Sequence, residues 1–174
     1  MNSFSEIQRF RVRWAWVGVI AMNCLFMYAI IQQIVLGKPF GTKPAPDVVL
    51  IAVEIFLLLL LFFVMSIRLK TSYSSEGIQY RFYPFQFATT TIGWDELSDA
   101  YIREYNSLFE YGGWGIRYGS NKTGRAINTS ESCNKGLQLR FSNGKLLLIG
   151  TKNPVALQKI LDEVIIAGKI NRIL

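Results

Sequence analysis

The sequence contains no histidine and only two cysteines, Cys24 and Cys133. Histidine is the commonest general base and the commonest metal ligand, so its absence removes both chemistries together. Two cysteines so far apart provide neither a disulfide framework nor a cysteine-rich metal cluster. Charged residues are also scarce, at 18%, whereas apolar residues make up 51%, which excludes a disordered chain.

Motifs for catalysis are lacking as well. The sequence has no phosphate-binding loop, dinucleotide fingerprint or metal-ligand spacing. Asp95, Glu96 and Asp99 fall in a polar turn region, where solvated loop acids are the usual case. Cys133 has no histidine to activate it, so we interpret it as an inert loop thiol. We therefore predict a protein that is not an enzyme and that uses no cofactor and no metal.

Two long apolar runs dominate the first third of the chain. Trp14 to Leu36 carries no charge, and Val48 to Ile67 carries only Glu54. As a helix, each run is roughly 30 Å long or more, enough to cross a hydrocarbon core. Two adjacent runs of this length argue against buried helices of a soluble protein. The first run is also too long for a cleaved signal peptide and precedes no small-residue cleavage site. Residues 1–68 are therefore predicted to form a transmembrane hairpin, with spans near 14–36 and 48–67.

The charges around the runs predict the direction of this hairpin. The connector from Gly37 to Asp47 has three prolines and two glycines, so neither helix continues through it. It carries two basic residues, Lys38 and Lys43. Five basic residues lie on the outer sides of the runs: Arg9, Arg11, Arg13, Arg68 and Lys70. Since basic residues accumulate on the cytoplasmic side, we expect a multi-pass inner-membrane protein with both termini in the cytoplasm.

Glu54 requires a physical reason to lie inside a membrane span. A charge at mid-bilayer costs about 2.5 kcal/mol or more on insertion scales. Gln32 and Gln33 are expected at a comparable depth on the other helix, and a hydrogen bond from one of these amides to Glu54 would join the hairpin. In this interpretation Glu54 has a structural role: it holds the two helices together, or its side chain extends to the outer surface of the membrane. The alternative is an ion or substrate pathway, which needs an oligomer because two helices cannot enclose one.

Residues 69–174 show short alternating runs separated by turn residues, followed by one stretch with helical spacing. The predicted strands are 69–75, 78–85, 90–94, 99–105, 115–118, 125–129, 136–141 and 145–151. Asn153 and Pro154 are suited to the N-cap and first turn of an amphipathic helix that extends to Gly168. About seven or eight strands and one terminal helix predict a bent sheet or partial barrel that the helix caps.

Several segments of this domain suggest a family. They are GIQYRFYPF at 77–85, TIGWDEL at 91–97, YIREYN at 101–106, EYGGWGIRYG at 110–119, GLQLRFSNGK at 136–145 and LLIGTKNP at 147–154. With two preceding spans, this pattern resembles bacterial membrane-anchored proteins with a pleckstrin-homology-like domain. The resemblance implies seven strands in two near-orthogonal sheets with a C-terminal helix. It implies roles in binding and assembly at the membrane, and no catalytic residues.

Lipid-binding members of the wider fold hold phosphoinositides with basic residues in the first hairpin turn. The turn here, Ser74 to Gly77, has none.

The stretch from Glu110 to Tyr118 concentrates glycine and aromatic residues. Aromatic side chains and arginine are enriched in protein contacts, so this stretch predicts a recognition surface for a peptide or protein. Its candidate residues are Tyr111, Trp114, Arg117 and Tyr118, with Arg103 from the preceding strand. The alternative is a β-bulge corner in which Trp114 fills the core.

The net charge of +7, with a pI of about 9.5, suggests an anionic partner. Beside an anionic inner leaflet, the loop residues Lys122, Arg125 and Lys135 would draw the domain onto the bilayer. Nucleic acid is not expected, because the basic residues are scattered and no nucleic-acid motif occurs.

Two functions follow from these observations. The favoured one is a non-enzymatic, membrane-tethered binding or scaffold module that recognises a protein partner, or its own copies as a homo-oligomer, at the inner membrane face. The alternative is a regulatory or structural subunit of a membrane channel or transport assembly that uses Glu54.

Overall fold

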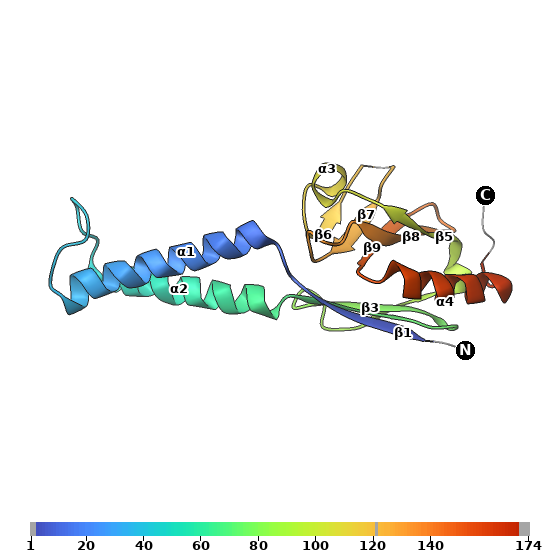
Figure 1. Ribbon diagram of the computed structural model, residues 1–174, viewed down its shortest axis with the longest axis horizontal. Coiled ribbons are helices and arrows are strands. Elements are labelled where there is room, and N and C mark those ends of the chain that lie inside the picture. Colours follow the sequence, from blue (N-terminus) through green and yellow to red (C-terminus); the bar gives the residue numbers. More distant parts are fainter. Residues whose placement is uncertain (1–2, 121, 171–174) are drawn as a thin grey trace. The chain divides into compact units, whose positions relative to one another are not determined.

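The computed structural model describes residues 3–120 and 122–170, so the predicted outer limits at residues 1 and 174 lie outside the described residues. The chain divides into two compact units. One consists of Val12–Ser66, and the other contains the residues up to Arg11 together with those from Ile67 onward. Figure 1 shows a pair of helices in the first unit and the β-strands in the second.

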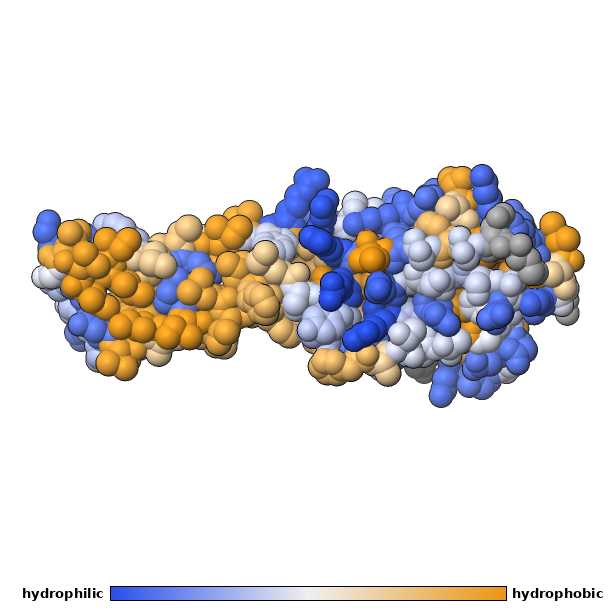
Figure 2. Space-filling view, turned by 90° about the horizontal axis from the view of Figure 1, so that it is seen from below, coloured by the Kyte–Doolittle hydropathy of each residue, from blue (hydrophilic) through white to orange (hydrophobic). Residues whose placement is uncertain are grey.

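The first unit is helical. Helix α1 (Arg13–Ile30) continues as a π-helical turn, η1 (Ile31–Val35), and helix α2 (Asp47–Ser66) follows the connector. Both helical segments are long and apolar enough to cross a membrane by length and composition. Large apolar side chains cover their outer surface, and Figure 2 shows them as a nearly continuous apolar area over this unit.

The second unit contains two sheets. The first is four-stranded and antiparallel, with the order β1-β2-β3-β4. Its strands are β1 (Phe4–Arg9), β2 (Arg68–Tyr73), β3 (Gly77–Tyr83) and β4 (Thr90–Gly93). The strand pattern of β2 is regular, because Leu69, Thr71 and Tyr73 are buried while the residues between them are more exposed.

The second sheet is five-stranded, with the order β5-β8-β9-β7-β6. Its strands are β5 (Leu97–Glu104), β6 (Gly115–Tyr118), β7 (Arg125–Asn128), β8 (Lys135–Phe141) and β9 (Leu146–Thr151). Strands β7 and β9 pair in parallel, and the other neighbours are antiparallel. Strand β6 pairs with β7 alone, so it forms one edge of the sheet.

The predicted partial barrel is wrong, because the strands form two sheets that do not close into a barrel. The eight predicted strands are all present, within a few residues of the expected bounds. A ninth strand, β1, was not predicted; it lies in a segment that the sequence assigned to the transmembrane hairpin. Two short helical elements were also missed: the 3-10 turn η2 (Trp94–Glu96) and helix α3 (Ser107–Tyr111).

The C-terminal helix, α4 (Pro154–Ile166), is confirmed. The Asn153 side chain accepts a hydrogen bond from the Ala156 N–H (3.1 Å), as expected of an N-cap. The helix contributes four buried apolar side chains, Leu157, Ile160, Leu161 and Val164, to the same core that both sheets line. Burial of this helical stripe is what holds α4 on the domain.

Strand β1 joins the two sheets through polar side chains. Gln8 is wholly buried; its Nε2 donates to the Gly150 carbonyl (2.7 Å), and its Oε1 accepts from Thr129 Oγ1 (3.1 Å). Glu6 accepts from Thr151 Oγ1 and from the Lys152 N–H, both at 2.8 Å. The residues just before α1 are therefore an integral part of the β domain.

Candidate functional site

The residues of the predicted recognition surface are distributed over three places in the domain. Arg103 and Tyr111 form one cluster, Trp114 and Arg117 line a small apolar pocket, and Tyr118 lies in a larger pocket with Arg125. The last two places lie along strand β6, which therefore becomes the centre of the candidate site.

Arg103 and Tyr111 are committed to contacts within the domain. The Arg103 guanidinium donates to Gln138 Oε1 (2.9 Å), Glu110 Oε2 (2.8 Å) and the Tyr111 hydroxyl (2.8 Å). Tyr111 is only 4% exposed, and burial raises the pKa of its hydroxyl. This cluster joins β5, β8 and α3, so its two predicted contact residues offer little to a partner.

The glycine-rich stretch begins as a helix end. Asn106 caps α3, because its side chain accepts from the N–H groups of Leu108 (3.0 Å) and Phe109 (3.1 Å). Gly112 ends the helix in the left-handed conformation, with φ of 69°, which glycine adopts without the penalty of a side chain. The chain then enters β6 at Gly115. The sequence GGWG is therefore the connection that places an edge strand after a short helix.

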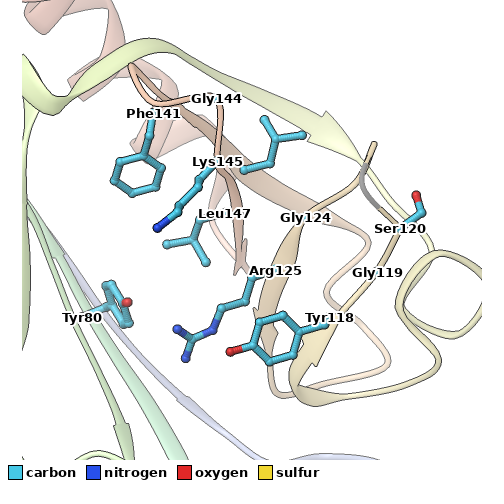
Figure 3. Close-up of a pocket in the computed structure, with 11 residues that line it drawn as sticks. Tyr80, Tyr118, Gly119, Ser120, Gly124, Arg125, Phe141, Gly144, Lys145 and Leu147 are labelled. Atoms are coloured by element: carbon cyan, nitrogen blue, oxygen red, sulfur yellow. The ribbon is translucent and has the colours of Figure 1, made fainter.

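The larger pocket, which we call the tyrosine pocket, is a cavity of about 580 Å³ beside β6. Its side-chain lining comes from both sheets: Tyr80, Tyr118, Ser120, Arg125, Phe141, Lys145, Leu146 and Leu147. Figure 3 shows Tyr80 at the lower left, Arg125 and Tyr118 at the lower right, and Phe141, Lys145 and Leu147 above them. Three lining residues are glycines, and no lining residue is acidic.

Arg125 and Lys145 give the tyrosine pocket its charge. The Arg125 guanidinium lies 5.7 Å from the ring centroid of Tyr118, a cation–π contact that orients it without neutralising it. No described acidic side chain forms an ion pair with either residue. Tyr118 itself is 76% exposed, so its ring offers a flat surface next to the Arg125 guanidinium, and Lys145 lines the same pocket. Such a pocket suits a ligand that carries an anionic group next to an apolar or planar one.

The smaller pocket, which we call the tryptophan pocket, has a volume of about 280 Å³. Its walls are mainly apolar: Phe10, Ile67, Phe82, Phe85, Trp114, Gly115, Ile116 and Arg117. Ile116 and Tyr118 are two residues apart on β6, and Phe82 and Tyr80 are two residues apart on β3. Because side chains alternate along a strand, each pair lies on one face, and the two pockets follow each other along β3 and β6.

Strand β6 is thus an edge strand with a pocket at each of two successive positions along it. The open edge of β6 offers backbone donors and acceptors to an added strand, while pockets accept alternate side chains. The groove, defined here as β6 with the tyrosine and tryptophan pockets, has basic and aromatic side chains on its walls. Arg117, whose Nε donates to the Trp114 carbonyl (3.0 Å), adds a third cation in the lining of the tryptophan pocket.

The three predicted membrane-surface residues have different surroundings. Arg125 lines the tyrosine pocket. Lys135, at the start of β8, forms an ion pair with Glu104 (3.3 Å), and the two side chains are 44% and 74% exposed. Lys122 is exposed in the loop between β6 and β7.

The expected hydrogen bond between Glu54 and one of the two glutamines does not form. Gln33 Nε2 donates instead to the Ala45 carbonyl (2.8 Å) and to Asp47 Oδ1 (2.6 Å), and Gln32 Nε2 donates to the Tyr28 hydroxyl (3.2 Å). The π-helical turn η1 carries both glutamines next to the connector, which explains why they bind there. Glu54 is 5% exposed, and neither carboxylate oxygen has a partner among the described residues.

Sequence reasoning missed Tyr80 and Lys145. The sequence places them only within the predicted strands 78–85 and 145–151, without a functional role. They reach the same pocket because β3 and the β8–β9 turn are brought together by folding, for which the sequence carries no local signal.

Comparison with known protein families gives a match over residues 2–167 to the family described as "Family of unknown function (DUF6141)". Because the match covers nearly the whole sequence, the chain belongs to this family. A comparison with curated proteins found no match.

Proposed function

We propose that this member of the DUF6141 family is a non-enzymatic binding module tethered to the inner membrane. In this proposal α1 and α2 span the bilayer and both termini lie in the cytoplasm. The groove along β6 binds an extended, acidic segment of a protein partner or of another copy of the chain. The pleckstrin-homology-like relationship is part of the proposal, supported by two sheets that share a core with one C-terminal helix.

One observation carries the proposal: the tyrosine pocket holds two cations and no acid directly beside an edge strand. An acidic side chain of an added strand would replace water around Arg125 and Lys145 and gain charge-assisted hydrogen bonds. The edge of β6 supplies the sequence-independent part of the affinity through backbone hydrogen bonds. No nucleophile–base pair is needed for this role.

Site-specific photocrosslinking tests this function in native membranes. A benzophenone amino acid replaces Tyr118, which is 76% exposed beside the groove, and in a matched control it replaces Phe109, which is 87% exposed on α3. We expect a discrete adduct from position 118 and none of the same mass from position 109. Peptide mapping should locate the crosslink in an acidic segment.

A second pair of variants tests the charges. Arg125→Glu combined with Lys145→Glu should abolish the adduct at position 118, because the groove then repels an acidic strand. Lys122→Glu, an exposed change in the neighbouring loop, should leave it intact. Equal adducts from positions 118 and 109, or an adduct that survives the double charge reversal, would contradict the proposal.

The channel or transport alternative is favoured by one observation, the buried Glu54 carboxylate without a partner in the helical unit. A carboxylate in this environment is a site for a proton or cation if copies of the hairpin assemble around a path. Ion flux into proteoliposomes should then be measurable and should fall in Glu54→Gln. Zero flux in both proteins would eliminate this function.

A further inference from the structure

The outer face of the four-stranded sheet carries four cations that the site above does not use. On β2, Arg68 and Lys70 are exposed, whereas Leu69 and Thr71 between and beside them are buried. Strands β1 and β3 each add one basic residue to the same side of the sheet. We call this set the basic face: Arg9, Arg68, Lys70 and Arg81.

The pairing register sets these cations against one another. Arg9 is the partner of Arg68 across β1 and β2, and Lys70 is the partner of Arg81 across β2 and β3. Like charges directly opposite each other are destabilising in a sheet. Glu6, the acid on β1, forms its hydrogen bonds with Thr151 and Lys152 instead. Neither described ion pair involves the basic face, so its charge is available to an anionic partner.

Exposed aromatic residues adjoin the basic face. The loop after β3 presents Phe85, 56% exposed, and Phe87, 75% exposed. The Arg68 guanidinium lies 5.1 Å from the ring centroid of Tyr83, and that ring lies 6.2 Å from the ring of Phe87 in an edge-to-face contact. Arg68, Tyr83 and Phe87 therefore form one continuous series of contacts that leads from a cation of the basic face to an exposed apolar ring.

The position of this surface along the chain favours lipid as its partner. Arg9 and Arg68 pair at the last step of the β1–β2 ladder, and the Phe10 N–H donates to the Ile67 carbonyl (3.2 Å) just beyond it. The chain passes from there into α1 at Arg13 and leaves α2 at Ser66. The basic and aromatic residues thus lie at the end of the sheet that connects directly to both apolar helices.

We infer that the basic face and Phe87 dock the β domain onto anionic lipid headgroups of the membrane in which the helices are held. Cations bind the phosphate layer, and aromatic rings insert at the headgroup–acyl boundary. This inference rests on the proposed membrane tether. It assigns lipid contact to residues other than Lys122, Arg125 and Lys135, leaving the groove along β6 for a protein partner.

An environment-sensitive fluorophore on the full-length chain tests the inference. In a Cys24→Ser background, Phe87→Cys is labelled with a nitrobenzoxadiazole dye and reconstituted into nanodiscs. Cys133 stays unlabelled because it is buried and its thiol donates to Gln8. Phe109→Cys, on α3, is the matched control. With phosphatidylglycerol present, the label at 87 should shift to the blue and be quenched by shallow brominated lipid, whereas the label at 109 should report water.

The charges are tested in the same preparation. Lys70→Gln and Arg81→Gln should each reduce the ratio of docked to undocked domain roughly fivefold, and pure phosphatidylcholine should have a similar effect to removing the charges. A label at 87 that reports water in both lipids overturns the inference, and so does one that shifts equally in both. A shift induced by polyglutamate but not by lipid would assign the face to an acidic protein and also overturn it. Loss of the protein from the nanodisc would instead refute the membrane tether itself.

Discussion

Gln8 is the residue on which the connection between the two sheets most depends. Its amide satisfies the Gly150 carbonyl and accepts from Thr129 and Cys133 within the interior. Gln8→Ala leaves these groups without a partner, so we expect it to lower the free energy of unfolding by about 2–3 kcal/mol. Urea denaturation in detergent micelles, followed by tryptophan fluorescence, to which buried Trp94 contributes, measures this change. Ile7→Ala, on the same strand but 60% exposed, is the control and should unfold at nearly the wild-type midpoint.

Cys133 gives a prediction about pH. Burial raises the pKa of its thiol from the usual 9.0 to about 11; nearby Lys152 lowers the pKa and Glu6 raises it. Because the thiolate is the reactive form, a rise of this size reduces its population at neutral pH about a hundredfold. In a Cys24→Ser background, maleimide should therefore modify the folded chain at least that much more slowly than the urea-unfolded chain. The rate should rise until the pH approaches 11. Rapid modification of the folded chain at pH 7 would show that the thiol is exposed.

At the scale of the elements, helix α4 owes its start to Asn153. The side chain accepts from the Ala156 N–H, and Pro154 follows at the first helical position. Asn153→Ala should cost about 1 kcal/mol of domain stability because the N–H loses its acceptor. Asn153→Asp keeps the acceptor and should remain close to wild type in the same urea titration. Equal losses in the two variants would show that the cap contributes nothing.

The elements also show what the sequence could predict. Strands such as β8 were found because Leu137 and Leu139 alternate with polar neighbours, and α4 was found from its cap and apolar stripe. Strand β1 was missed because its polarity is inverted: Gln8 points inward and is wholly buried, whereas Ile7 is 60% exposed. Hydropathy alternation cannot identify a strand whose buried residue is held by hydrogen bonds.

The candidate site was predictable only in pieces. Tyr118 and Arg125 were both selected from the sequence, for different roles, and they share the tyrosine pocket. Arg103 and Tyr111 were selected for the same reasons of residue type, but they bind each other. Residue type shows which side chains are able to make contacts; whether those contacts are internal depends on pairings such as β5 with β8, which bring together residues far apart in the sequence.

For the whole molecule, the pairing of β1 with β2 restricts the membrane topology. Both strands belong to one sheet, and each continues into one of the two apolar helices, so both helices must enter the membrane from the side of the β domain if they span it. A topology with the termini on opposite sides would break this ladder. The pairing therefore requires both helices to leave the same sheet, and the choice of the cytoplasmic side remains a prediction from the charge bias alone.

Cysteine labelling of intact bacterial cells tests this arrangement. In the Cys24→Ser background, Thr42→Cys places a thiol in the exposed connector and Phe109→Cys places one on the β domain. A membrane-impermeant maleimide should label position 42 in intact cells and position 109 only after the inner membrane is permeabilised. The reverse pattern would place the β domain outside the cytoplasm, beyond the reach of a cytoplasmic partner. Labelling of both positions in intact cells would show that α1 and α2 lie on the membrane without crossing it.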